Sequence, residues 1–304
     1  MAGEIVPGEN AVNEQEIYGV PLTIEGCTVL HQIFRFRWAE WRKLAAKDKA
    51  EVVGGALAAF SEAETDGQSA LFNLLGHKGD LLFVHLRDSF EALSEAQQRW
   101  NQLRLSDFCE PTSSYVSIVE LSLHDSSLKL YRQLAEQGVA PHSEAWDAVI
   151  RETLERQREA MRPRLYPKIP DTRYICYYPM DRRRGEDKNW YTLPLAERQR
   201  QMDIHGTVGR RYAGKVQQVI SGSIGFDDWE WAVDLFGNDA AVFKKLIYEM
   251  RFDEVSAVYS NFGTFYLGLR CPLASLGGLL DGHSPKFEPA ELPSPAGRPA
   301  HRPK

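Results

Sequence analysis

The stretch VQQVISGSIGFDDWEWAVDLF, residues 216–236, contains two apolar segments, VQQVISGSIGF and WEWAVDLF, that predict two consecutive strands. Outward from this pair, residues 193–213 and 240–260 have apolar positions at helical spacing. Beyond the two predicted helices, RYICYYPM (173–180) and FGTFYLGLR (262–270) are predicted to be strands. The order of elements in this part of the chain is therefore β-α-β-β-α-β.

The first half of the chain repeats this order with different residues. VLHQIFRFRW alternates aromatic residues with arginines, which is the period-two pattern of a half-buried strand. Two apolar runs around a glycine-bounded turn predict a hairpin between two amphipathic helices. The predicted strands and helices are 29–38, 47–63, 70–86, 89–103 and 114–123. We interpret the two halves as an internal duplication that is visible in the order of the predicted elements and not in residue identity.

Two β-α-β-β-α-β units predict an α+β fold of two tandem ferredoxin-like modules, each an antiparallel sheet with helices on one face. The other face of each sheet must also be covered. Either the two sheets pack together, as a barrel or a sandwich, or neighbouring subunits cover them. The predicted boundaries are a polar leader (1–28), an N-terminal module (29–142), a connecting helix and linker (143–170), a C-terminal module (171–276) and a proline-rich, disordered tail (277–304).

Composition excludes several classes of function. The formal net charge of −6 argues against nucleic acid or an anionic membrane as a partner. No run of about eighteen apolar residues and no basic, apolar leader occurs, which predicts no membrane insertion and no export. The four cysteines form no CxxC pair, so they indicate neither a zinc knuckle nor a dithiol motif. We expect a soluble, cytoplasmic protein with reduced thiols.

His205 interrupts the apolar face of the predicted helix 193–213. A lone histidine in such a position is commonly a core residue that bonds a backbone carbonyl. Gly206 and Gly209 suggest close approach of another group to the helix, since each glycine costs roughly 1 kcal/mol relative to alanine. That group could be a flat macrocycle or a neighbouring helix. No second ligand has metal-binding spacing to His205, which excludes a zinc site, whereas a porphyrin needs only one axial ligand.

Several polar residues of the second half could form a site around this histidine. Along the strand that begins at 173, Tyr178, Met180 and Arg182 fall on one face, a pattern typical of a redox or anion site, although a frayed strand end would also explain it. Gln218 could be a buried amide donor or an ordinary exposed residue. Arginines that could bind carboxylates, or be solvated surface charges, are Arg164, Arg210 and Arg251.

The residues YYPMDRRRGEDKNWYTLPLAERQRQMDIHGTVGRRYAGKVQQVISGSIGFDDWEWAVDLF, followed by YEMRFDEVSAVYSNFGTFYLG, closely resemble the coproheme decarboxylases, a branch of the chlorite dismutase-like superfamily. The close match covers about residues 164–270. The resemblance implies two ferredoxin-like modules per subunit, a homopentamer and haem in the C-terminal module. It also implies conversion of iron coproporphyrin III (coproheme), which is both substrate and cofactor, to haem b, with hydrogen peroxide used to remove two propionate carboxyls as carbon dioxide. Transient contact with the ferrochelatase that supplies coproheme is a further implication.

By motif, the resemblance assigns iron ligation to His205, the radical-forming catalytic tyrosine to Tyr178, and contact with bound peroxide to Gln218. The residues that match positions around the porphyrin and its propionates are Arg164, Tyr178, Pro179, Met180, Asp181, Arg182, Trp190, Arg210, Gln218, Arg251 and Ser256. Candidate carboxylates for orienting the histidine ring are Glu249 and Glu254.

The chain departs from the family pattern at Arg182, where coproheme decarboxylases carry a catalytic lysine. Arginine keeps the positive charge but is a poorer proton donor, which affects the order or rate of the two decarboxylations. Chlorite dismutases have a distal arginine where this chain has Gln218, so we do not expect chlorite to be split. The alternatives are a haem peroxidase or chlorite dismutase-like protein with another substrate, and a haem-binding or delivery module without turnover.

Overall fold

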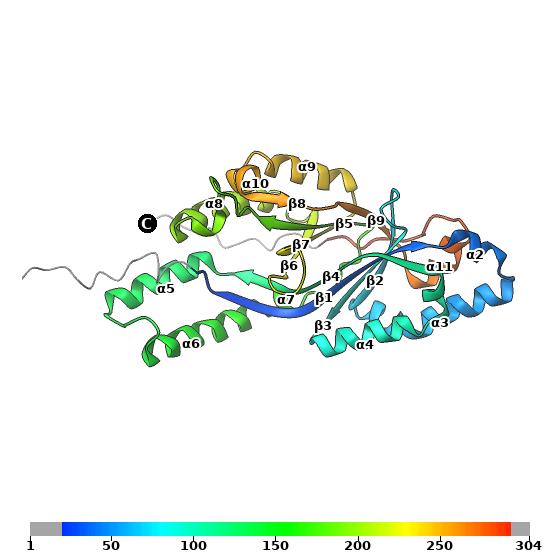
Figure 1. Ribbon diagram of the computed structural model, residues 1–304, viewed down its shortest axis with the longest axis horizontal. Coiled ribbons are helices and arrows are strands. Elements are labelled where there is room, and N and C mark those ends of the chain that lie inside the picture. The colour runs from blue at the N-terminus through cyan, green and yellow to red at the C-terminus, as the bar shows by residue number, and fades with distance from the viewer. Residues whose placement is uncertain (1–19, 293–304) are drawn as a thin grey trace, which may run out of the picture.

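A computed structural model describes residues 20–292 (Figure 1). Its strands are β1 (Thr23–Phe36), β2 (Ser69–Leu74), β3 (Leu81–Arg87), β4 (Cys109–Ser122), β5 (Tyr174–Arg182), β6 (Val216–Gly222), β7 (Trp231–Gly237), β8 (Ser260–Phe262) and β9 (Tyr266–Arg270). Its helices are α2 (Trp38–Lys43), α3 (Ala46–Thr65), α4 (Phe90–Asn101), α5 (His124–Glu136), α6 (Glu144–Ala160), α7 (Arg162–Leu165), α8 (Leu195–Arg210), α9 (Ala240–Met250), α10 (Glu254–Tyr259) and α11 (Leu276–Leu280). The α+β class is confirmed.

The two halves share one antiparallel sheet that closes on itself. Within the described residues the strands follow the order β7-β6-β4-β1-β3-β2-β9-β5-β8, and β7 also pairs with β5. The halves join at two seams, because β4 pairs with β6 and β2 pairs with β9. Closure removes the unpaired edges that an open sheet would expose. Of the alternatives left open by the sequence, the structure therefore shows a barrel formed within one chain.

Side chains that alternate along each strand fill the barrel on one face and contact helices on the other. The barrel interior contains apolar residues of both halves, among them Val29, Phe72, Ile175 and Phe236. On the outside, α3, α4 and α11 cover the strands of the first half (Figure 1). Helices α8 and α9 cover β5 and β7 of the second half (Figure 1). The predicted functional residues belong to this second outer layer.

Two predicted elements of the second half are interrupted in the structure. The helix predicted over 240–260 ends at Met250 and restarts at Glu254, because the Asp253 side chain caps α10 by accepting a hydrogen bond from the Ser256 amide at 2.8 Å. The strand predicted over 262–270 is divided into β8 and β9. Gly263 lies at the break, where an added Cβ would approach Pro179 Cγ to 2.8 Å.

Other boundaries also differ from the predictions. Strand β1 begins at Thr23, inside the predicted leader, and Trp38 begins α2 rather than ending that strand. Helix α5 was not predicted, and α11 lies in the predicted tail with Leu279 and Leu280 buried. Beyond it, hydrogen bonds join Ala290 to Asp171 and Asn238. The predictions for residues 1–19 and 293–304 lie outside the described residues.

Two properties of the described residues bear on the expectations from composition. All four cysteines lie in this part of the chain, and each is free and buried. None of the helices within residues 20–292 has the length and apolar character needed to cross a membrane.

Candidate functional site

His205 lies on α8 and presents one ring nitrogen away from the protein. Helix α8 is anchored by the buried side chains of Leu195 and Val208, whereas the His205 side chain is 23% exposed. Its Nδ1 lies 2.8 Å from Asp253 Oδ2. Within residues 20–292, Nε2 has no hydrogen-bond partner. The ring is thus not a core histidine bonded to a backbone carbonyl, and Nε2 is the nitrogen free to bind a ligand.

Asp253 both caps α10 and orients the His205 ring. Its Oδ1 accepts the Ser256 amide hydrogen bond while Oδ2 faces the imidazole, and its side chain is only 4% exposed. Burial raises the pKa of Asp253, but the hydrogen bonds from His205 and Ser256 outweigh burial and lower it overall. The ionised carboxylate favours a proton on Nδ1, which leaves the lone pair on Nε2.

The two glutamates that the sequence offered as possible partners of His205 have other partners. Glu249 accepts hydrogen bonds from Arg211 and Tyr212, and Glu254 pairs with Arg200. The carboxylate that contacts the ring is Asp253. The sequence did carry a signal for Asp253. It lies three residues before Ser256, which is the spacing of a helix N-cap and its amide donor. The prediction of one continuous helix over 240–260 hid this signal.

The two glycines of α8 make room for different neighbours. A Cβ at Gly209 would lie 3.4 Å from Met250 Cε, so this glycine faces helix α9. A Cβ at Gly206 would lie 3.2 Å from one terminal guanidinium nitrogen of Arg210. The other terminal nitrogen of Arg210 donates to Thr207 Oγ1 at 2.6 Å. Gly206 therefore allows the Arg210 guanidinium to lie over the helix one residue from His205.

Tyr178 lies on the outer face of β5, as the alternation predicted, and is 6% exposed. Its ring stacks on Phe265 with centroids 4.4 Å apart and lies 6.0 Å from the Phe262 ring. Burial raises the pKa of the Tyr178 hydroxyl above its ordinary value, and the nearby Arg251 and Arg182 only partly offset this. The phenol is therefore neutral at physiological pH. Neither phenylalanine was predicted to belong to the site.

Two arginines flank Tyr178 on this side of the sheet. The Arg251 guanidinium lies over the Phe262 ring at 3.6 Å. Arg182 donates to Ser260 Oγ at 2.6 Å and lies over the ring of the buried Trp190 at 4.9 Å. Burial lowers the pKa of Arg182 to about 10, so the guanidinium keeps its charge at neutral pH. Met202 of α8 contacts Arg182 through its sulfur at 3.5 Å, which links this cluster to the helix that carries His205.

Gln218 shares the outer face of the sheet with Tyr178. Through the strand register, Ile220 pairs with Val233, and Val233 pairs with Tyr178. Gln218 lies two residues from Ile220 on the same face, and both side chains are exposed. The outer face of β6 is therefore exposed near Tyr178, and the Gln218 amide and the Ile220 side chain are accessible there.

Four of the predicted residues lie apart from this cluster. Arg164 is exposed on α7, and within the described residues its side chain contacts only Met161 Sδ at 4.0 Å. Pro179 and Asp181 alternate with Tyr178 and therefore face the opposite side of β5, where Asp181 accepts the Glu230 amide at 2.7 Å. Ser256 Oγ lies 3.5 Å from His205 Nδ1, on the side of the ring that faces Asp253. The assigned roles of these residues in propionate binding remain predictions.

Comparison with known proteins identifies the family of the chain. The model of the chlorite dismutase family matches residues 49–271, which span both halves of the barrel and every residue of the cluster. The chain belongs to the chlorite dismutase family. Solved chlorite dismutases of this family share its fold at low identity: one mutant of the enzyme from Candidatus Nitrospira defluvii has a TM-score of 0.63 and 14% identity, covering 84% of this chain and 95% of that one.

Three proteins of higher identity to this chain are described as heme-binding proteins. A solved structure of a "novel heme-binding protein" from Thermus thermophilus is 37% identical, with a TM-score of 0.73, and covers 87% of this chain and 99% of that one. A "putative heme-binding protein" of Haloquadratum walsbyi is 41% identical over 86% of this chain and 47% of its own length. A "putative heme-binding protein" of Halobacterium salinarum is 38% identical over 91% of this chain and 52% of its own length. The chain thus spans about half the length of these two archaeal relatives.

Proposed function

We propose that this member of the chlorite dismutase family binds coproheme and decarboxylates it to haem b with hydrogen peroxide. The observation that carries the proposal is the His205–Asp253 pair, which leaves one imidazole nitrogen free on a helix whose Met202 contacts Arg182, in the same outer layer as the buried Tyr178 and Arg251. The heme-binding relatives support binding of a haem, and the motif resemblance supports coproheme and its decarboxylation. We further propose the homopentamer that the resemblance implies.

The residues present fit an iron porphyrin better than a bare metal ion. Within the described residues no three His, Cys, Asp or Glu side chains are grouped to hold a metal, whereas an iron porphyrin needs one axial ligand. Ile204 beside the histidine is 47% exposed and Ile220 on β6 is 40% exposed, so apolar surface is available for a macrocycle. Arg182, Arg210 and Arg251 supply the cations that propionates require.

The overall reaction is balanced for each propionate. One –CH2–CH2–COOH group and one hydrogen peroxide give one vinyl group, one carbon dioxide and two waters. The carbon chain loses two electrons, which reduce the peroxide. When bound, the iron porphyrin supplies the oxidising power that peroxide generates at its iron.

The residues of the chain then have separate tasks. His205 holds the iron through Nε2, and Asp253 keeps the Nδ1 proton and the ring orientation. The Tyr178 phenol, once oxidised and deprotonated, would take a hydrogen atom from the β-carbon of a propionate. Arg182 and Arg251 hold carboxylates near this phenol by charge-assisted hydrogen bonds. Gln218 offers an amide to peroxide on the exposed outer face of β6.

The test is to add coproheme and then hydrogen peroxide to the purified protein, and to follow product masses. We expect stepwise loss of one carbon dioxide and two hydrogens from each of two propionates, which ends at haem b. If coproheme binds through histidine and its mass does not change, the protein is a haem-binding module, as its relatives are named, and the proposed reaction is wrong. If coproheme does not bind, the whole proposal fails.

Asp253→Asn should weaken iron ligation without unfolding α10. Asparagine caps a helix about as well as aspartate, so only the charge facing Nδ1 is lost. Loss of such a carboxylate typically costs about 10- to 100-fold in metal affinity or activity. We expect a loss in this range and a lower iron–imidazole stretching frequency by resonance Raman spectroscopy.

The matched control for this variant is Asp239→Asn, since Asp239 caps α9 by accepting the Ala241 amide at 2.9 Å and contacts no histidine among the described residues. Its vibrational frequency and turnover should equal those of the wild type. An unchanged frequency in Asp253→Asn would contradict the assigned role of this carboxylate.

A further inference from the structure

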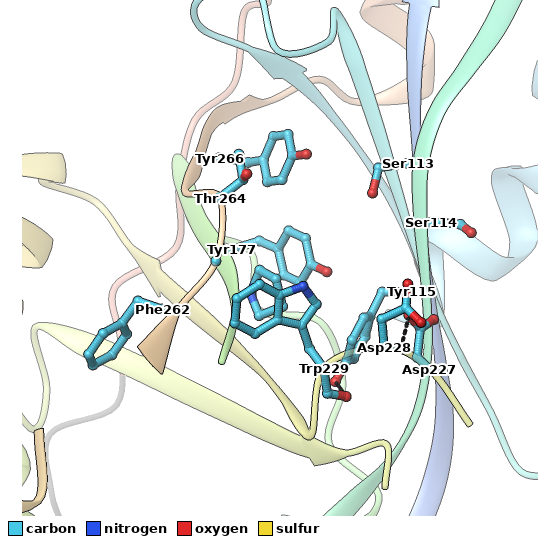
Figure 2. Close-up of a pocket in the computed structure, with 12 residues that line it drawn as sticks. Ser113, Ser114, Tyr115, Tyr177, Asp227, Asp228, Trp229, Phe262, Thr264 and Tyr266 are labelled. Carbon is cyan, nitrogen blue, oxygen red and sulfur yellow. Dashed lines mark hydrogen bonds between the residues drawn. The ribbon is translucent and has the colours of Figure 1, made fainter. Parts of the chain in front are cut away.

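A cavity opens on the other side of β5 from Tyr178. It has a volume of about 420 Å³ and lies between β4, the end of β5, the loop before β7 and the loop between β8 and β9 (Figure 2). Its lining residues are Ser113, Ser114, Tyr115, Tyr177, Pro179, Asp227, Asp228, Trp229, Phe262, Gly263, Thr264 and Tyr266. Because consecutive residues of a strand face opposite sides, Tyr177 faces this cavity while Tyr178 faces the candidate haem site.

The cavity combines aromatic rings with carboxylates. Figure 2 shows Tyr177, Trp229 and Tyr266 on one side of the space and Ser113 on the other, with Asp227 and Asp228 at its lower edge. Tyr177 and Tyr266 stack with centroids 5.7 Å apart. The lining contains two aspartates and neither lysine nor arginine. It therefore offers π faces and negative charge with no cation of its own.

The walls of the cavity are held in place by the protein itself. The Tyr115 hydroxyl donates to the Trp229 carbonyl at 2.9 Å. Asp227 accepts the Val116 amide at 3.1 Å and the Asp228 amide at 2.8 Å. Asp228 is exposed, and within residues 20–292 its carboxylate has no hydrogen bond or ion pair. One carboxylate is thus used to shape the loop, and the other is free to pair with a ligand.

The surrounding charges make the cavity electronegative. Burial raises the pKa of the Tyr177 hydroxyl, and Asp234 and Asp227 raise it further. Burial likewise raises the pKa of Tyr115, to which Asp227 also contributes. Asp234 is paired with His31, whose Nε2 lies 3.0 Å from its Oδ1, so the lining aspartates Asp227 and Asp228 are the charges that disfavour an anion in the space and favour a cation.

We propose that this cavity binds a small organic cation, an ammonium or methylated ammonium compound, between the aromatic rings of Trp229 and Tyr266 and the carboxylate of Asp228. Tyr177 forms the inner wall, since its ring is buried and stacks on His31 at 4.2 Å and on Tyr266 at 5.7 Å. Aromatic faces attract such cations through the ring quadrupole, and recognition of quaternary ammonium groups by aromatic cages is a recurrent use of this interaction. A bare metal ion fits less well: Asp227 already accepts two backbone amides, which leaves one free carboxylate, whereas Ca²⁺ and Mg²⁺ take about six or more oxygen ligands. The volume lies in the range of small-molecule sites, about 300–1,000 Å³.

The experiment uses the full chain and two probes of equal shape, choline and its neutral carbon isostere 3,3-dimethylbutan-1-ol, measured by isothermal titration calorimetry. We expect choline to bind and the isostere to bind at least about tenfold more weakly, since a desolvated cation–π contact is worth about 1–2 kcal/mol. Equal binding of both probes, or no binding of choline at millimolar concentration, would overturn the proposal.

Three variants locate the site. Trp229→Leu should weaken choline binding about tenfold by removing the largest π face. Asp228→Asn should weaken it about two- to fivefold, the effect of a partly exposed charge. Glu152→Gln removes an exposed carboxylate on α6, which supplies no lining residue, and should leave the affinity unchanged. Thermal unfolding verifies that each variant is folded. If Trp229→Leu and Asp228→Asn are both folded and bind choline as the wild type does, the cavity is not the binding site.

The outcome is independent of the proposed decarboxylation. Choline affinity should be the same with and without coproheme, because Trp229, Tyr266 and Asp228 take no part in the candidate haem site, and Phe262 is the one lining residue whose ring also contacts that of Tyr178. A protein that fails to bind coproheme could still bind choline here, and the converse also holds.

Discussion

Tyr178→Phe should abolish the conversion of coproheme to haem b while coproheme still binds. The phenylalanine ring keeps the stack on Phe265 at 4.4 Å and fills the same buried space. Only the hydroxyl is lost, and with it the hydrogen atom that the oxidised residue must give up and regain. We expect the rate of decarboxylation to fall by at least about 10³-fold, or about 4 kcal/mol of barrier.

Binding of coproheme to Tyr178→Phe should change by less than about tenfold, because a hydroxyl in such a position contributes only about 1 kcal/mol. Binding is followed by the optical spectrum during titration, and turnover by product mass. The matched control is Tyr174→Phe, which removes a hydroxyl four residues earlier on the same face of β5 and should leave turnover unchanged. Haem b formed at the wild-type rate by Tyr178→Phe would rule out the tyrosine mechanism.

His205→Ala should remove iron ligation and turnover together. Asp253 is then left without its imidazole partner, but α10 keeps its cap because the hydrogen bond from the Ser256 amide at 2.8 Å does not involve the ring. The protein should therefore fold, and the missing ligand leaves a hollow of the shape of imidazole. We expect turnover to fall by about 10²- to 10⁴-fold, and millimolar imidazole to restore part of it.

Rescue by added imidazole separates ligation from a structural role, since a collapsed site would not be rescued. His77→Ala serves as the control, because His77 is exposed in the turn between β2 and β3. Turnover and the optical spectrum of that variant should match those of the wild type. If His205→Ala retains the wild-type spectrum of bound coproheme, the iron is held elsewhere and the assignment of the axial ligand is wrong.

Much of the candidate site was predictable because its signals are local. The two-residue period of β5 determines that Tyr178 and Arg182 share one face and that Tyr177 takes the other. The three- and four-residue spacing of α8 determines that His205 shares a face with Val208. Such periodicities follow from backbone geometry alone, so they survive folding unchanged.

The structure revealed what neighbours in space contribute. Asp253 reaches His205 across 48 positions of sequence, and the restart of the helix at Glu254 brings it there. The stack of Phe265 on Tyr178 depends on the break between β8 and β9. Neither the helix break nor the strand break appeared in the periodicity, because each depends on one side chain or one close contact.

The amino-acid sequence by itself determined the β-α-β-β-α-β order of the main elements in both halves, the faces of β5 and α8, and the lone histidine that suits a porphyrin rather than a zinc ion. Only the tertiary structure decided that two seams, β4 with β6 and β2 with β9, close the halves into one barrel. It also decided which carboxylate orients His205, and that an aromatic, acidic cavity lies behind Tyr178. The physical reason is that hydrophobic periodicity reports which face of an element is buried, whereas partner, seam and cavity depend on contacts between residues far apart in the chain.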